Sequence, residues 1–483
     1  MRKRAALTAA PLAALACHAA AQISTGGAIS GNDRSVCGGA NPKLAVAACT
    51  RLINGRDGSA DVRALALRNR GYQFQLSGDL DRAIADYTAV LKLTGPDNRQ
   101  NAKLYVNRGL AFAQRRDADH AMADYDAAIR LDPGIASAYL DRAALHMDRG
   151  DDAGAIADLI GALRLEPRNA ALYVSRGAVF AHSGDEDHAI ADDTTAIGLD
   201  KSNAMAWRDR GAAWRAKGDS TRAQADAAEA IRLDPAMAAA HLDLALTLEA
   251  AGEAERATAE FDKAIRLAPT DAETIKARGD AYLAEGDRDQ AIADYSQAIS
   301  LDPKLNSAYN NRGVAYLEEA KCDEAIADFS TVISIDPGEA PAWLDRGEAR
   351  ERNGDSAGAL TDFNEALRLA PTTAEALRQR AFLRQTTGND AAAISDFSAL
   401  ISLLPNDAAA YRGRGFSELS LHRYGPAIAD LTTTIGIDPT DALAYRFRSQ
   451  AEVAVHDLSK ASSDDAAALR LGAKLPPISK IQP

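Results

Sequence analysis

Residues 272–305, AETIKARGDAYLAEGDRDQAIADYSQAISLDPKL, decide the fold, because their landmarks recur every 34 residues along most of the chain. Steps of 34 from Gly279 always reach a small residue, and an alanine stands twelve residues after each one. A fixed period with fixed small positions indicates pairs of helices that approach closely and bury their apolar faces only by stacking on neighbours. Twelve units carry the small position: Gly71, Gly109, Ala143, Gly177, Gly211, Ala245, Gly279, Gly313, Gly347, Ala381, Gly415 and Ser449.

Each unit is predicted to contain two helices. In the quoted stretch the first is expected over Ala272–Glu285 and the second over Asp289–Leu301, with Gly286-Asp287 as the break. The Asp302-Pro303 pair ends the second helix, because proline lacks the N–H that would continue it. No strands are expected, since β-branched runs are short and every segment has helical periodicity.

The landmarks resemble the tetratricopeptide repeat family, in which a bulky residue, a small residue and an aromatic residue are followed by alanine, aromatic and proline. In one unit these second-helix landmarks are Ala291, Tyr295 and Pro303, and the bulky position of the next unit is Tyr309. The resemblance covers residues 64–475. It implies an all-α, right-handed superhelical solenoid of about twelve two-helix repeats, which holds partners on its first helices.

A few positions depart from this pattern. Lys201 stands where a closing proline is expected, and Asp193 and Ala227 replace second-helix aromatic residues. Towards the C-terminus the first-helix aromatic residue is replaced by Arg350, Arg384, Glu418 and Glu452. The register is unaffected, because the small positions keep their spacing.

Length and charge limit the classes of function. The chain has 483 residues, enough for about three ordinary domains, but the unbroken period indicates one elongated solenoid. Its formal net charge is −13. Such a surface repels nucleic acid and anionic lipid on average. Solubility of a long exposed molecule is the ordinary explanation for the charge.

Residues 1–21 have the pattern of a secretory signal peptide: three basic residues, an alanine- and leucine-rich stretch, then Ala19-Ala20-Ala21. Cleavage after Ala21 would give an exported protein, periplasmic or secreted. A lipoprotein anchor at Cys17 is a less expected alternative, because Ala14 stands where the usual motif has leucine. An uncleaved N-terminus is the remaining alternative.

Residues 22–63 are expected to form a lead-in and a capping helix. The part up to residue 40 is rich in glycine, serine and asparagine and is predicted to be extended or loosely ordered. The helix is predicted to begin with Asn41 as its cap and Pro42 in its first turn, and to end near Gly55.

Cys37 and Cys49 are expected to form a disulfide if the chain reaches an oxidising compartment. Closing a loop of twelve residues contributes about 3 kcal/mol by the chain-entropy argument, which suits a terminal cap with one neighbour. Two reduced thiols are the alternative. A zinc site is not expected, because no suitably spaced ligands complete it. At the other end, residues 476–483 are expected to be a tail.

Arginine precedes the small position in eleven of the twelve units, and aspartate stands sixteen residues after that arginine in eleven. Leu244 and Glu260 are the exceptions, and they belong to the same unit. We expect an Arg–Asp ion pair between the two helices of each unit, with a structural role, because a catalytic site is not needed eleven times. The central pairs are Arg278 with Asp294, Arg312 with Asp328, and Arg346 with Asp362.

No motif for catalysis is present. The sequence contains no phosphate-binding loop, dinucleotide fingerprint, nucleophile elbow or H-E-x-x-H motif. His182 and His188 flank a turn, where solvated side chains are a better explanation than a metal site. We therefore expect no enzyme, no cofactor and no bound metal.

Two successive units carry the same pair of residues on their first helices, Arg378 with Phe382 and Arg412 with Phe416, and Arg446 continues the row. Residues four apart share a helix face, and the repeat places equivalent residues side by side. We call these five residues the arginine–phenylalanine strip. Ordinary groove packing with solvated arginines is the alternative explanation.

These observations predict an exported scaffold that binds a protein or peptide in its concave groove. An acidic protein or peptide is one form of this prediction. The main alternative is a structural subunit that self-associates or organises an envelope complex, and an enzyme is the remote one. No integral membrane segment and no nucleic-acid partner are expected.

Overall fold

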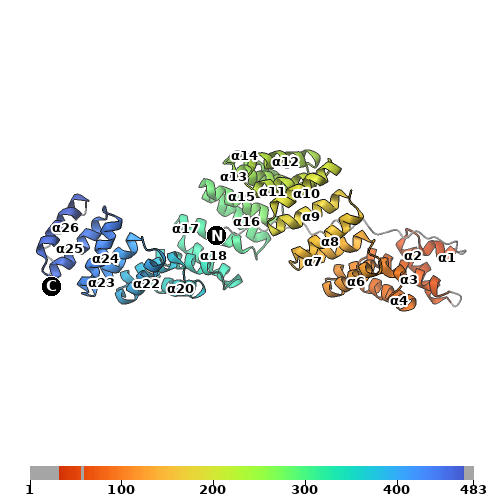
Figure 1. Cartoon of the computed structure of the whole chain (residues 1–483), viewed down its shortest axis with the longest axis horizontal. Helices are drawn as coiled ribbons and strands as arrows, with labels where there is room; N and C mark the ends of the chain where they lie inside the picture. Colours follow the sequence, from red (N-terminus) through yellow and green to blue (C-terminus); the bar gives the residue numbers. More distant parts are fainter. Residues whose placement is uncertain (1–31, 56–58, 473–483) are drawn as a thin grey trace. The chain divides into compact units, whose positions relative to one another are not determined.

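The computed structural model describes residues 32–55 and 59–472. In these ranges every regular element is a helix, and no strand occurs among them (Figure 1). The proposed signal peptide, Cys17 and the expected tail 476–483 lie outside the described residues. None of the described helices is both long and apolar enough to cross a membrane.

The helices belong to two compact units, Met1–Leu267 and Ala268–Pro483. In the first unit, repeats 1 to 6 follow two capping helices. Their bounds are α1 (Asn32–Cys37), α2 (Pro42–Asn54), α3 (Ala60–Leu76), α4 (Leu80–Thr94), η3 (Arg99–Asn101), α5 (Ala102–Gln114), α6 (Ala118–Leu131), α7 (Ala136–Asp148), α8 (Asp152–Leu165), α9 (Ala170–Ser183), α10 (Glu186–Leu199), α11 (Ala204–Ala216), α12 (Ser220–Leu233), α13 (Ala238–Ala250) and α14 (Ala254–Leu267).

The second unit contains repeats 7 to 12, each an odd-numbered first helix followed by an even-numbered second helix. Their bounds are α15 (Ala272–Glu285), α16 (Arg288–Leu301), α17 (Asn306–Glu318), α18 (Cys322–Ile335), α19 (Ala340–Arg352), α20 (Ser356–Leu369), α21 (Ala374–Thr386), α22 (Asp390–Leu403), α23 (Ala408–Ser420), α24 (Tyr424–Ile437), α25 (Ala442–Ala454) and α26 (Leu458–Arg470).

Repeat 7 shows why these boundaries occur. Helix α15 ends at Glu285, and its C-cap is Gly286, whose φ of 85° lies in the left-handed region that favours glycine. Asp287 then caps α16, its side chain accepting the N–H of Gln290 at 3.2 Å. The helix ends before Pro303. The first helix has its predicted bounds, and the second begins one residue earlier than predicted, at Arg288.

The core of each repeat lies between its two helices. Tyr295 is fully buried against Gly279, where a Cβ atom would lie 2.9 Å from the ring. The small residue is therefore required for the helices to approach. Further repeats bury equivalent side chains, which are less than 2% exposed: Tyr87, Tyr125, Phe261, Phe329, Phe363 and Phe397.

The N-terminal cap contains one helix that we did not predict. Helix α2 begins and ends as expected between Asn41 and Gly55. Helix α1 replaces part of the predicted loose lead-in. It is held to α2 by the Cys37–Cys49 disulfide, with Cα atoms 4.8 Å apart, and by Asp33, which accepts two hydrogen bonds from Arg51. These contacts stabilise a segment whose composition alone suggests a loop.

Candidate functional site

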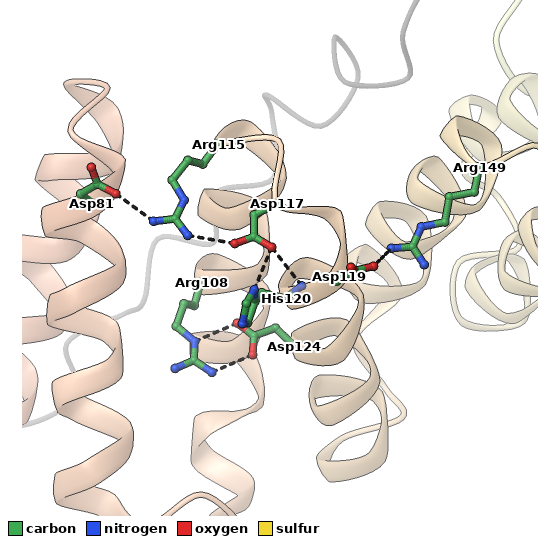
Figure 2. A network of polar contacts seen from close by, with 8 residues as sticks. All are labelled: Asp81, Arg108, Arg115, Asp117, Asp119, His120, Asp124 and Arg149. Atoms are coloured by element: carbon green, nitrogen blue, oxygen red, sulfur yellow. Dashed lines mark hydrogen bonds and ion pairs between the residues drawn. The ribbon is translucent and has the colours of Figure 1, made fainter.

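The expected Arg–Asp pairs are present in eleven repeats. Arg312 donates from Nε and Nη2 to the two oxygens of Asp328 at 2.8 and 2.7 Å, and the side chains are 17% and 7% exposed. Arg278–Asp294 and Arg346–Asp362 have the same two-bond geometry. Figure 2 shows the equivalent contact between Arg108 of α5 and Asp124 of α6. Two parallel charge-assisted hydrogen bonds fix the two helices relative to each other.

The same arginines also connect neighbouring repeats, a contact that we did not predict. Nη1 of Arg312 donates to Ser296 Oγ of the preceding second helix at 2.8 Å. Nine repeats make this contact with a short polar residue: Thr50, Thr88, Asp126, Thr194, Ser296, Ser330, Asn364, Ser398 and Thr432. The recurrence of a short polar residue at this position was the available sequence signal.

Repeat 6 replaces the pair with a different one. Glu260 of α14 accepts from Lys263 at 2.7 Å and lies 2.7 Å from Nδ1 of His241, which stands in the bulky position of α13. Burial opposes the charge of Glu260, but these contacts outweigh it and hold the pKa of the carboxyl below its usual value. Glu260 therefore has two partners, His241 and Lys263, in the repeat where leucine replaces the arginine.

The arginine–phenylalanine strip lies on α21, α23 and α25, and its arginines are already paired. Nη2 of Arg378 donates to Oδ2 of Asp407 at 2.8 Å, and Nη1 donates to Glu375 at 2.6 Å. Nη1 of Arg412 donates to Oδ2 of Asp441 at 2.6 Å. Asp407 and Asp441 are the N-caps of α23 and α25. Each arginine thus connects one first helix to the beginning of the next.

The pairing with Asp407 is the main reason why the pKa of Arg378 is raised, and burial opposes it less strongly. Arg378 and Arg412 keep side chains that are 32% and 31% exposed. Each guanidinium carries five N–H donors and uses only part of them here. Both can therefore offer hydrogen bonds to another molecule, although nearby carboxylates already neutralise their charge.

The two phenylalanines are half-buried in contact with other rings. Phe382 meets Phe397 edge to face with ring centroids 5.1 Å apart, and Phe416 meets Phe447 at 4.7 Å. Arg446 differs from its equivalents. It is only 4% exposed and bonds to Asp465 of α26 at 2.8 Å, so it does not extend the accessible part of the strip. The sequence could not show this, because it depends on the position of Asp465.

One carboxyl in the first unit has an unusual environment. Asp193 occupies the aromatic position of α10, is 1% exposed, and its Oδ1 has no hydrogen-bond partner. Burial, reinforced by the charges of Asp209 and Asp192, raises the pKa of Asp193 to about 9. The group is therefore neutral at pH 7.

In residues 32–55 and 59–472, no three His, Cys, Asp or Glu side chains are arranged to hold a metal ion. Nδ1 of His182 lies 3.0 Å from Oδ1 of Asp152, and Nδ1 of His188 lies 2.7 Å from Oδ2 of Asp185, both at the surface.

Comparison with known proteins gives matches to two repeat models. One, described as TPR repeat, matches residues 279–319. The other, described as Tetratricopeptide repeat, matches 70–135, 208–272 and 315–374. These segments lie in both compact units. No curated protein matches the chain.

Several solved structures are similar over long or short parts of the chain. The anaphase-promoting-complex hetero-tetramer Cut9–Hcn1 covers 89% of this chain and 96% of its own, with 15% identity and a TM-score of 0.38. Yeast Tom70 covers 86% of this chain and 99% of its own, with 18% identity and a TM-score of 0.35. YrrB is described as a TPR protein with an unusual peptide-binding site. It covers 39% of this chain and 97% of its own, with 22% identity and a TM-score of 0.35.

Proposed function

This chain is a tetratricopeptide-repeat protein, and from that premise we propose that it is an exported scaffold that binds a protein or peptide on its first helices and does no chemistry. Repeat arrays of this kind present continuous surfaces along equivalent helices. The polar groups that recur here, the Arg–Asp pairs, are explained by helix packing.

The observation that carries the proposal is the pair of arginines, each about one-third exposed, beside half-buried phenylalanines on α21 and α23. Arginine and aromatic side chains are enriched among the residues that dominate binding energy. Here an apolar anchor of the partner would pack on Phe382 and Phe416, and its carbonyl or carboxylate oxygens would accept from Arg378 and Arg412.

The contacts within the strip also refine the partner's chemistry. Because Glu375, Asp407 and Asp441 balance the arginine charge, the strip offers hydrogen bonds more than net positive charge. We therefore favour a segment with one carboxylate or several backbone carbonyls between apolar residues over a strongly acidic tract. Binding should weaken only modestly with added salt.

The test is a comparison of two double variants. Arg378→Gln with Arg412→Gln should weaken binding to a partner recovered from an envelope extract several-fold and leave the helical circular-dichroism signal unchanged. Arg288→Gln with Arg368→Gln makes the same change in charge at exposed arginines outside the strip. Equal binding by both variants would refute the role of the strip.

Export is supported by the Cys37–Cys49 disulfide, because such bonds persist in oxidising compartments. The signal-peptide pattern of residues 1–21 supports it independently. Periplasmic or secreted location is thus part of the proposal, with cleavage after Ala21.

Self-association is a second candidate, favoured by exposed leucines in repeat 12. Leu458 and Leu469 of α26 are 65% and 61% exposed, and Leu443 of α25 is 47% exposed. Exposed apolar side chains of this kind suit contact with another copy. Light scattering after gel filtration would show a mass that increases with concentration, and a monomer at all concentrations would exclude this candidate.

A further inference from the structure

Four of the six second helices of the first unit share a feature near their N-terminal ends. We call the position three residues after the N-cap residue the cap slot. In repeats 1, 2, 4 and 5 this slot holds a basic side chain that pairs with the cap carboxylate and stacks on an aromatic ring of the first helix. The slot residues are Arg82, His120, His188 and Arg222.

Repeat 2 shows the occupied slot. Nδ1 of His120 lies 2.8 Å from Oδ1 of Asp117, the N-cap of α6 (Figure 2). Its ring stacks on Phe112 with centroids 5.0 Å apart. The side chain in the cap slot thus fills the space between the aromatic ring of the first helix and the beginning of the second helix.

Repeat 3 lacks both partners of this arrangement. Gly154 stands in the slot of α8, and His146 replaces the aromatic residue of α7. A cavity of about 490 Å³ lies there, between α6, α7 and α8. Its charged or ionisable lining consists of Asp126, Arg142, His146, Arg149, Asp151 and Asp158. The histidine takes over the cap contact, with Nδ1 2.7 Å from Oδ2 of Asp151.

Repeat 9 shows which group fits this space. It also has glycine in the slot, Gly358, but arginine at the preceding aromatic position. Nη1 of Arg350 donates to Oδ2 of Asp362 at 2.9 Å and to the carbonyl oxygen of Gly358 at 3.4 Å. Asp362 accepts this third hydrogen bond while it is already paired with Arg346. An aspartate of the Arg–Asp pairs can therefore hold two guanidinium groups.

In repeat 3 the second guanidinium is missing. Asp158 corresponds to Asp362 and is paired with Arg142. The histidine is too short to replace an arginine, since its Nε2 stays 3.8 Å from Oδ2 of Asp158. The carbonyl of Gly154 and the carboxylate of Asp158 thus retain acceptor positions that Arg350 occupies in repeat 9.

We propose that the cavity at Gly154 binds the guanidinium group of an arginine side chain supplied by another molecule. The guanidinium would donate to Asp158 and to the carbonyl of Gly154, and its plane would lie on the ring of His146. Three carboxylates face the cavity, whereas its two arginines are already engaged, Arg142 with Asp126 and Asp158 and Arg149 with Asp119. Figure 2 shows the contact between Arg149 and Asp119.

The charge of Asp151 supports this assignment. The N–H of Gly154 is the main reason why the pKa of this carboxyl lies below its usual value; burial opposes the shift, and the contact with His146 adds to it. The carboxylate is ionised at neutral pH and attracts a cation. This site is formed by other residues than the arginine–phenylalanine strip, so either can exist without the other.

The test uses N-acetyl-L-arginine methylamide as the probe and the citrulline analogue, which has the same shape without the charge, as its control. Saturation-transfer NMR with the full chain should show saturable binding of the arginine probe. In the spectrum of the protein itself, the His146 ring signals should shift. The citrulline analogue should bind at least ten-fold more weakly. Equal binding of both probes would overturn the assignment of a guanidinium site.

Reciprocal variants identify the site. His146→Arg reproduces repeat 9 and should fill the cavity with an internal guanidinium, reducing probe binding at least ten-fold without lowering the melting temperature. Arg350→His should open an equivalent cavity in repeat 9 and add a second binding site. Unchanged probe binding by His146→Arg would contradict the proposal, even if Arg350→His failed to fold.

Discussion

Arg312 Nη2 lies 2.7 Å from Oδ1 of Asp328, and Arg312 Nη1 lies 2.8 Å from Ser296 Oγ of the preceding repeat. One side chain therefore joins three helices. Because the same geometry recurs along both units, these arginines contribute to the packing within repeats and to the packing between them.

Replacing Arg312 with leucine should lower the free energy of unfolding by about 1–3 kcal/mol, because Asp328 would remain buried without its partner. The double variant with Asp328→Leu should recover part of this loss. Urea unfolding of the four proteins gives the double-mutant cycle. Additive losses would mean that the two side chains do not interact.

Asp193 predicts a pH dependence of stability. Its pKa of about 9 is higher than that of an unfolded aspartate, about 3.9, so the folded state binds the proton more tightly. The contribution of Asp193 to the free energy of unfolding is fully present below the unfolded pKa and decreases as the pH rises towards 9.

Asp193→Asn keeps the shape of the neutral group and removes its titration. It should stabilise the protein at pH 8 by at least about 1 kcal/mol, one pKa unit being worth about 1.4 kcal/mol, and should have little effect at pH 4. The measurement is the melting temperature of both proteins at the two pH values. If the two proteins differed in melting temperature by the same amount at pH 4 and at pH 8, the pKa of Asp193 would not be raised by folding.

The disulfide and export predict one chemical result. Protein recovered from its native host should begin at Gln22, and Cys37 and Cys49 should resist alkylation until they are reduced. Reduction should lower the melting temperature, since the closed loop contributes about 3 kcal/mol. An intact Met1 together with freely alkylated thiols would remove both proposals.

The sequence predicted the repeats because their determinants are local and periodic. Gly279 faces Tyr295, and the equivalent glycine faces the equivalent ring in repeats 1, 2, 8 and 9, so spacing alone reveals the contact. The Arg–Asp pairs were predicted for the same reason. Helix α1 was missed because its stability depends on Cys49 and Arg51 of the next helix.

The candidate site was less predictable, because its accessibility depends on non-repeating neighbours. The sequence placed Arg378, Arg412 and Arg446 in one row, but Asp407, Asp441 and Asp465 decide how much of each is exposed. The cavity of repeat 3 was missed because it results from two substitutions, His146 and Gly154, that are informative only together.

Site-specific photo-crosslinking can show whether the first helices of the second unit hold a partner. A benzoylphenylalanine at Glu375, which is exposed and bonded to Arg378 within the strip, should crosslink to one defined partner in the native host. The same residue at Thr433, exposed on the second helix α24, is the matched control. We expect a discrete crosslinked species at Glu375 that is absent at Thr433 and is lost with Arg378→Gln and Arg412→Gln. Crosslinks at Thr433 alone, or an unchanged species in the arginine variants, would contradict this expectation.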